Sequence, residues 1–226
     1  MKSINDDQLL KKLLKETRIS GIFSLDISEI VELFLFKEGE YLIHQGEYSE
    51  YLYFLASGRV KVFSTNLSGN IVPFGYYQRF RVIGEVSLLW GKKPDTSVQA
   101  VEKCYCFGIN LEKHRHILLN DNSFLRYICK LLCSIVKTLD NNMAVLMFMP
   151  LETRLASFIL QNTEDGIFQS SLLECSELIA TSYRHLLRMM KDFCDRGMLK
   201  KEKQKYLVVD EKKLREIASE PYRYYG

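Results

Sequence analysis

Residues 171–199 constrain the fold of this 226-residue chain most strongly, because they carry start and stop signals for two short helices joined by a tight turn. Ser171 and Glu174 match the S-x-x-E capping box, whose side chains satisfy free backbone N–H groups at a helix start. Ser182 can cap a second helix, and Gly197 can end it. The spacing predicts a helix-turn-helix.

The two faces of the second helix differ. Apolar residues recur at three- to four-residue steps, and we expect them to face inward: Leu186, Leu187, Met190 and Phe193. The small residue Ala180 falls where two crossing helices must approach closely. The opposite face carries Tyr183, Arg184, His185, Arg188 and Lys191. Two arginines one turn apart suit recognition of base edges, because a guanidinium can donate two hydrogen bonds to guanine O6 and N7.

The residues after Gly197, LKKEKQKYLVV, alternate charged and apolar side chains around a polar turn, which predicts a β-hairpin wing. Residues 182–205 contain eight Lys or Arg and three acidic residues, a difference of +5, whereas the whole chain carries +3. Contacts to DNA phosphates need positive charge concentrated in this way. The alternative is a solvated face on an ordinary helical domain. The predicted DNA-binding residues are Ser182, Tyr183, Arg184, His185, Arg188, Lys191, Lys201 and Lys203.

Length and composition are those of a globular protein with one large or two modest domains. We expect no apolar run near the roughly 18 residues of a membrane span, and the N-terminus lacks the apolar core of a signal peptide. A cytoplasmic location without membrane contact is the prediction. Six cysteines are then expected to be reduced thiols.

Residues 6–18 have the pattern of an amphipathic helix, with leucines on one side and lysines on the other. From Val31 the period changes to two, and short β-rich runs are separated by glycines. These glycines are Gly39, Gly46, Gly58 and Gly69. The spacing predicts a small antiparallel barrel or roll with tight turns.

Several stretches resemble the CRP/FNR family of bacterial transcription regulators. LIHQGEYSEYLYFLASGRVKVF, SGN and IGEVSLLWG look like its β-roll sensor domain, and SYRHLLRMMKDFCDRGML looks like its recognition helix. The similarity covers about residues 30–215, and TSYRHLLR is similar to the YeiL-like branch.

The resemblance implies an α+β fold and a three-part organisation. A double-stranded β-helix of jelly-roll or cupin type would span residues 1–115, a dimerisation helix 116–149, and a winged helix-turn-helix 150–226. It also implies a homodimer that binds double-stranded DNA and RNA polymerase, and whether it is an activator or a repressor stays open. The sequence has no nucleotide-binding loop, no nucleophile elbow and no His and acidic cluster at metal spacing, so we do not expect an enzyme.

Cyclic-nucleotide-binding members of this family carry a phosphate cassette, which this sequence matches only in part. Gly84 and Glu85 match its first half, but the arginine position falls on Asp95, whose carboxylate would repel a phosphate. Lys92 and Lys93 could substitute, although lysine lacks the planar fork of arginine. The effector pocket would be lined by Gly84, Glu85, Asp95, Thr96 and Ser97. We do not expect cAMP as the effector, whose identity stays open.

The cysteines suggest a second sensor chemistry. Iron–sulfur members of the family use an N-terminal cysteine cluster, whereas no cysteine here precedes Cys104. Cys104 and Cys106 on a strand, and Cys129 and Cys133 on a helix, would each share a face and could form redox pairs or hold an iron–sulfur cluster. We favour buried cysteines as apolar filler instead, and expect no metal site.

A seven-residue repeat marks the central helix. Leu118, Leu125, Leu132, Leu139 and Leu146 recur at this interval. The Asp121-Asn122 turn interrupts the first heptad, so the repeat should begin near Phe124. Such a repeat is typical of a parallel two-stranded coiled coil, although a buried helix in a monomer would also be leucine-rich. The predicted dimer interface consists of Leu125, Cys129, Leu132, Val136, Leu139, Met143 and Leu146. A two-fold dimer would read a palindromic DNA site.

The sequence therefore predicts a homodimeric, sequence-specific DNA-binding transcription regulator. The alternative is a ligand- or redox-sensing module that acts through a protein partner. Salt dependence of DNA affinity separates the two, because protein docking releases no comparable number of counterions.

Overall fold

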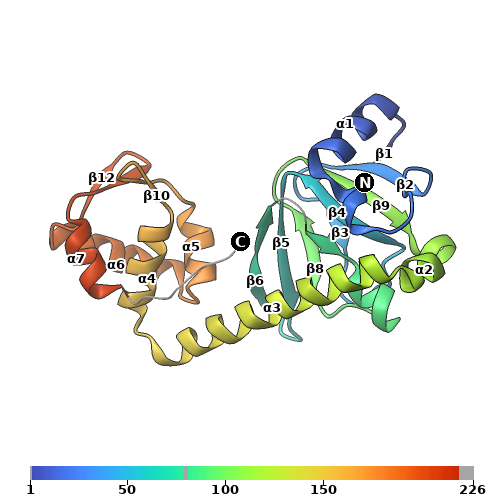
Figure 1. Ribbon diagram of the computed structural model, residues 1–226. Helices are drawn as coiled ribbons and strands as arrows, with labels where there is room; N and C mark the ends of the chain where they lie inside the picture. Colours follow the sequence, from blue (N-terminus) through green and yellow to red (C-terminus); the bar gives the residue numbers. More distant parts are fainter. Residues whose placement is uncertain (1, 79–80, 219–226) are drawn as a thin grey trace. The chain divides into compact units, whose positions relative to one another are not determined.

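The computed structural model describes residues 2–78 and 81–218. The chain divides into two compact units, with the boundary inside helix α3 between Cys133 and Ser134. The first unit is built mainly from antiparallel strands, and the second from helices with a small sheet (Figure 1).

The first unit begins with strand β1 (Lys2–Ile4), helix α1 (Asp7–Thr17) and the short helix η1 (Ile19–Ile22). Asp6 caps α1 by accepting a hydrogen bond from the Leu9 N–H at 2.9 Å. Leu13 is buried, which confirms the amphipathic helix predicted for residues 6–18. Sequence analysis did not predict β1, a strand of three residues that pairs with β2.

Two antiparallel sheets form the body of the first unit. The five-stranded sheet has the order β1-β2-β9-β4-β7, with β2 (Val31–Phe36), β9 (Cys104–Asn110), β4 (Tyr51–Ser57) and β7 (Val82–Ile83). The four-stranded sheet has the order β3-β8-β5-β6, with β3 (Tyr41–Ile43), β8 (Ser97–Ala100), β5 (Arg59–Thr65) and β6 (Ile71–Gln78).

The central strands of the five-stranded sheet, β2, β9 and β4, are largely buried on both faces, whereas β1 is mostly exposed. In β2, Leu33 belongs to an apolar cluster shared with the helices, whereas Phe34 belongs to a cluster shared with the other sheet. Strands buried on both sides have nearly continuous apolar sequences, which is why VELFLF and YLYFLAS alternate so weakly.

The glycine turns expected in the roll are confirmed, because Gly39, Gly46, Gly58 and Gly69 all have positive φ. Gly58 is further constrained by close packing. A Cβ atom at this position would lie 2.5 Å from the Lys103 carbonyl oxygen, so only glycine fits.

Helix α2 (Leu111–Asn120) is separated from α3 (Asn122–Phe148) by Asp121, as the sequence predicted. The Asp121 carboxylate accepts hydrogen bonds from the backbone N–H groups of Ser24 at 2.7 Å, Ser123 at 2.9 Å and Phe124 at 3.1 Å. Burial acts to raise the pKa of Asp121, but these hydrogen bonds outweigh it and bring the pKa below the ordinary 3.8. The charged carboxylate therefore fixes the start of α3.

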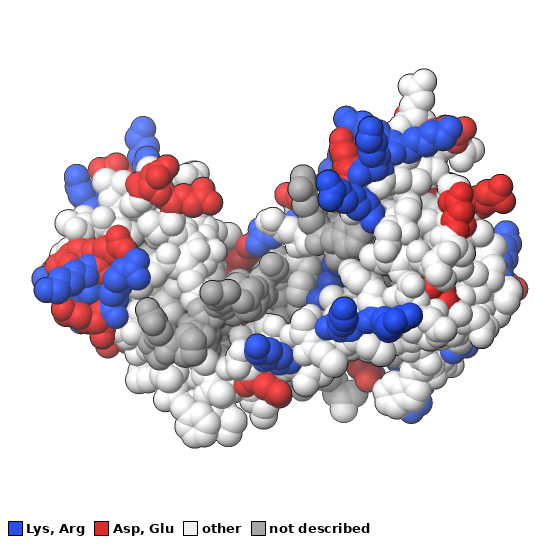
Figure 2. All heavy atoms as spheres, in the orientation of Figure 1, with Lys and Arg blue, Asp and Glu red and all other residues white. Residues whose placement is uncertain are grey.

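Helix α3 buries its first turns and exposes the rest. Phe124 and Ile128 are buried in the first unit, and Leu125 and Leu132 pack partly against the same core. The remaining residues of the predicted interface are exposed: Cys129, Val136, Leu139, Met143 and Leu146. Figure 2 shows blue Lys or Arg groups and red acidic groups among white, uncharged residues over α3, so charged side chains lie on this helix beside the exposed apolar ones.

Helix α3 also corrects one expectation. Among the described residues it is the one helix long and apolar enough, by length and composition alone, to cross a membrane. Those two properties are weak evidence for a span. The seven-residue spacing of its exposed apolar residues fits a partner helix on one side.

Up to residue 218, the second unit contains the end of α3, four further helices and a four-stranded antiparallel sheet in the order β10-β11-β13-β12. Its elements are α4 (Leu151–Gln161), β10 (Thr163–Glu164), β11 (Ile167–Phe168), α5 (Leu172–Leu178), α6 (Tyr183–Asp195), β12 (Leu199–Glu202), β13 (Lys205–Val208) and α7 (Glu211–Ile217). Its core includes Leu155, Phe158, Phe168, Cys175, Leu186, Met190, Phe193 and Leu214. The predicted hairpin after Gly197 is confirmed as β12 and β13.

The turn between α5 and α6 differs from the expectation. Ala180 is exposed and has a left-handed backbone, with φ 51°, so it does not separate two crossing helices. This backbone conformation carries a steric cost, because the Cβ atom of a residue in the left-handed region meets the following carbonyl oxygen, a contact that glycine would avoid.

Replacing Asp121 with alanine should lower the free energy of unfolding by about 2 kcal/mol, because three backbone N–H groups lose their acceptor. Folding lowers the pKa of Asp121 below 3.8. The carboxylate therefore makes its full contribution to the free energy of unfolding above pH 3.8, and this contribution is lost as the pH falls through the pKa of the folded state. Urea denaturation of Asp121→Ala and of the exposed neighbour Asn122→Ala, at pH 7 and below pH 4, measures this. A loss no larger than that of Asn122→Ala would contradict it.

Replacing Ala180 with glycine should raise the free energy of unfolding by about 0.5 to 1 kcal/mol, because glycine adopts positive φ without a steric cost. Circular dichroism during denaturation measures the change. Ala156→Gly, inside α4, serves as the control and should lower stability by about 1 kcal/mol or more. If Ala180→Gly also lowered the free energy of unfolding, the left-handed backbone at residue 180 would not be a source of strain.

Candidate functional site

The start of each helix in the α5–α6 pair is fixed by a serine cap. The Ser171 hydroxyl accepts a hydrogen bond from the Glu174 N–H at 3.4 Å, and the Ser182 hydroxyl accepts one from the His185 N–H at 3.2 Å. Gly197 follows α6 with φ 76°. The predicted starts of both helices and the end of α6 are therefore confirmed.

The buried face of α6 is narrower than predicted. Leu186, Met190 and Phe193 are buried, but Leu187 is 40% exposed, which corrects its inward assignment. Successive helical residues are rotated by about 100°, so Leu187 lies a quarter turn from Leu186. The three buried side chains already fill the contact with the core of the second unit.

All eight side chains predicted to bind DNA are exposed. Six lie on α6 or at its cap: Ser182, Tyr183, Arg184, His185, Arg188 and Lys191. The other two, Lys201 and Lys203, lie on the β12–β13 hairpin. Lys203 occupies the hairpin turn with φ 53°. The structure thus distributes the predicted residues over one helix and one adjacent hairpin.

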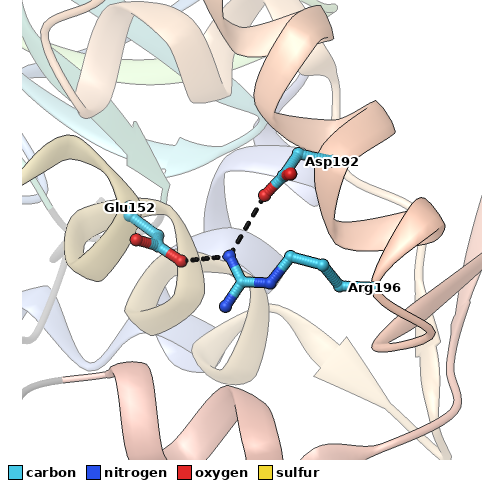
Figure 3. A network of polar contacts seen from close by, with 3 residues as sticks. All are labelled: Glu152, Asp192 and Arg196. Carbon is cyan, nitrogen blue, oxygen red and sulfur yellow. Dashed lines mark hydrogen bonds and ion pairs between the residues drawn. The ribbon is translucent and has the colours of Figure 1, made fainter.

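Not all the basic residues of this region are available to a ligand. Arg196, which follows α6, binds Glu152 of α4 at 2.5 Å and Asp192 at 3.1 Å (Figure 3). Hydrogen bonds from the guanidinium to these two carboxylates raise the pKa of Arg196. Lys200 pairs with Glu202 at 3.3 Å.

The positive charges that remain belong mainly to the predicted contact residues. In the described part of the chain, no ion pair engages Arg184, Arg188, Lys191, Lys201 or Lys203. Exposed ion pairs such as those of Arg196 contribute little stability. They do neutralise the positive charge of Arg196, whereas the exposed arginines of α6 keep theirs.

The residues predicted to line an effector pocket are only partly brought together. Gly84, Glu85 and Thr96 line one cavity of about 50 Å³ in the first unit. Asp95 instead lines a surface depression with Tyr48 and Trp90. Ser97 is buried, and its hydroxyl accepts a hydrogen bond from the Gln45 N–H at 3.0 Å.

Arg81 also lines the small cavity, and sequence analysis did not identify it. Its guanidinium lies 4.1 Å from the centre of the Tyr77 ring. Burial raises the pKa of Glu85, while backbone hydrogen bonds and the charge of Arg81 act in the opposite direction. No spacing signal marks this arginine, because it precedes the Gly-Glu pair instead of following it.

The described residues do not fit a cyclic nucleotide in this cavity. Sites for ligands of that size enclose about 300 Å³ or more, well above the volume found here. Lys92 and Lys93 do not line the cavity either. Lys92 Nζ lies 3.9 Å from the centre of the Trp90 ring, and Lys93 Nζ lies 5.6 Å from the centre of the Tyr48 ring.

The two predicted cysteine pairs lie in different environments. Cys104 and Cys106 are fully buried in the apolar cluster between the sheets. Burial raises the pKa of Cys104 to about 11 and that of Cys106 well above its ordinary value, so both stay protonated thiols. Cys129 and Cys133 are exposed on α3. Within residues 2–78 and 81–218, no group of three or more His, Cys, Asp or Glu could hold a metal ion.

Comparison with known proteins finds relatives that cover most of the chain. Residues 33–121 match the family described as "Cyclic nucleotide-binding domain". The chain is 31% identical to Regulatory protein YeiL of Escherichia coli O157:H7 over 92% of its own length and 94% of that protein. It is 25% identical to the Cyclic AMP receptor protein of Thermus thermophilus, over 74% and 78% of the two lengths.

Solved structures share the fold. The structure of FixK2 from Bradyrhizobium japonicum superposes with a TM-score of 0.68 at 14% identity, covering 85% of this chain and all of that one. The mixed α+β fold with antiparallel sheets and a long helix is therefore that of known transcription regulators. The extent of the YeiL match shows that the chain belongs to the CRP/FNR family of transcription regulators.

Proposed function

We propose that this chain is a homodimeric, sequence-specific DNA-binding regulator that reads a palindromic site with α6. The observation that carries the proposal is the exposed face of this capped helix. Arg184 and Arg188 lie one turn apart there, and no ion pair in the described structure engages them. Arginines so placed can each donate two hydrogen bonds to a guanine edge.

The second unit, in this proposal, is a winged helix-turn-helix. Helices α5 and α6 form the helix-turn-helix, and the β12–β13 hairpin forms the wing. Lys201 and Lys203 on the wing, together with Ser182 and Lys191 on α6, contact phosphates. Phosphate contacts hold the protein in register on the duplex, and base contacts supply the specificity.

The first unit acts as the sensor, a jelly-roll of two antiparallel sheets. We assign the sensor to residues 1–115, the dimerisation helix to 116–149 and the DNA reader to 150–226. The effector is not cAMP in this assignment, because the cavity beside Glu85 is small and Asp95 replaces the phosphate-binding arginine. The predicted tail of the reader beyond residue 218 lies outside the described residues.

The exposed stripe of α3 supports a dimer with parallel helices. Val136, Leu139, Met143 and Leu146 are all more than 40% exposed and follow the heptad positions of a two-stranded coiled coil. Two-fold symmetry then places the DNA half-sites about 34 Å apart. The regulator works in the cytoplasm, without membrane contact, and binds RNA polymerase on the DNA.

Selection of bound duplexes from a random DNA pool tests the proposal directly. The wild type should enrich a palindrome, and the Arg184→Ala, Arg188→Ala double variant should not. Binding to the enriched duplex should weaken steeply with salt, because phosphate contacts release counterions. Absence of enrichment together with salt-independent partner binding would favour the module that acts through a protein.

The single variant Arg184→Ala should reduce discrimination between the selected site and a random duplex by about 1 to 3 kcal/mol, because one bidentate base contact is lost. Lys203→Ala is the matched control. It should weaken binding to both duplexes equally and lower the salt slope by about 1. An equal loss on both duplexes for Arg184→Ala would exclude base reading at this residue.

Mild oxidation with diamide should link two subunits through Cys129, which occupies a heptad position facing its symmetry mate. The two thiols each lose a proton and an electron to diamide as the S–S bond forms. Non-reducing electrophoresis measures the linked dimer. Cys133→Ser should still cross-link, and Cys129→Ser should not. Cross-linking of Cys129→Ser would place the interface elsewhere.

A further inference from the structure

Leu187 is the one aliphatic side chain on the exposed face of α6. It is 40% exposed, and Tyr183, one turn earlier on the same side, is 47% exposed. The core of the second unit does not need Leu187, because Leu186, Met190 and Phe193 already fill the buried side of the helix.

The neighbours of Leu187 are cationic. Arg184 lies at position i−3 and Lys191 at position i+4, and Arg188 follows Leu187 directly in the chain. Residues three or four apart share a helix face. The leucine is therefore presented inside a positively charged surface, which attracts a polyanion and disfavours an ordinary apolar protein partner.

The major groove of DNA offers one apolar group at its floor. Thymine presents its C5 methyl there, whereas the other exposed edges are hydrogen-bond donors and acceptors. We propose that Leu187 packs against the C5 methyl of a thymine in each half-site and so gives the chain a thymine preference. The inference rests on the proposed function of α6 as the DNA-reading helix.

The size of the effect follows from the group that is buried. Removing one methyl group from an apolar contact weakens binding about fourfold. A two-fold dimer makes the contact twice, so removal from both half-sites should weaken binding roughly fifteenfold.

Deoxyuridine provides the test, because it keeps the hydrogen-bonding edge of thymine and lacks only the methyl. The probe is the palindrome enriched by the wild-type chain, with each thymine replaced in turn by deoxyuridine in both half-sites. Affinities are measured for the full-length wild type, Leu187→Ala and Leu187→Met. Leu173→Ala is the matched control, because it makes the same substitution at another exposed leucine, which lies on α5 and is 58% exposed.

When thymine is replaced by deoxyuridine at one position, the affinity of the wild type and of Leu173→Ala should fall roughly fifteenfold. Leu187→Met should keep most of this preference for thymine. Leu187→Ala should bind the thymine and deoxyuridine probes equally. The inference fails if the half-site contains no thymine, if no replacement weakens the wild type, or if Leu187→Ala keeps the same ratio. In those cases enrichment of the palindrome still stands, whereas failure to enrich any duplex overturns the proposed function itself.

Discussion

The buried carboxylate of Asp121 is the interaction on which the arrangement of α3 depends. It accepts N–H groups from Ser24 and from the first turn of α3, so it joins the segment after α1 to the start of the long helix. With the start fixed, the helical repeat directs Phe124 and Ile128 into the core of the first unit. The same repeat leaves the later heptad positions in solvent.

In helix α6, too, a fixed start determines which side chains are buried. The Ser182 cap sets its first residue, and three buried side chains set its rotation about its axis. Met189 and Cys194 pack partly against the same core, and the rest of the helix surface is open to a ligand, including Leu187. A helix held by few core contacts presents more of its circumference, which is useful where a groove surrounds it on two sides.

Local signals explain which features could be predicted. Caps, glycine turns and the break at Asp121 depend on neighbouring residues, and each was confirmed. The Asp165-Gly166 turn between β10 and β11, a hairpin signal present in the sequence, was missed because the flanking strands have two residues each. The exposure of Leu187 and the place of Arg81 depend on distant packing, which periodicity does not contain.

Trp90 is the only tryptophan of the chain, and it lies in the first unit, 69% exposed with Lys92 beside its ring. Intrinsic tryptophan fluorescence therefore reports on this unit alone, because the other unit contains no tryptophan. The emission of Trp90 can therefore be followed while DNA and candidate effectors are added. By thermodynamic reciprocity, an effector that changes the affinity for DNA must have its own affinity changed by DNA by the same factor.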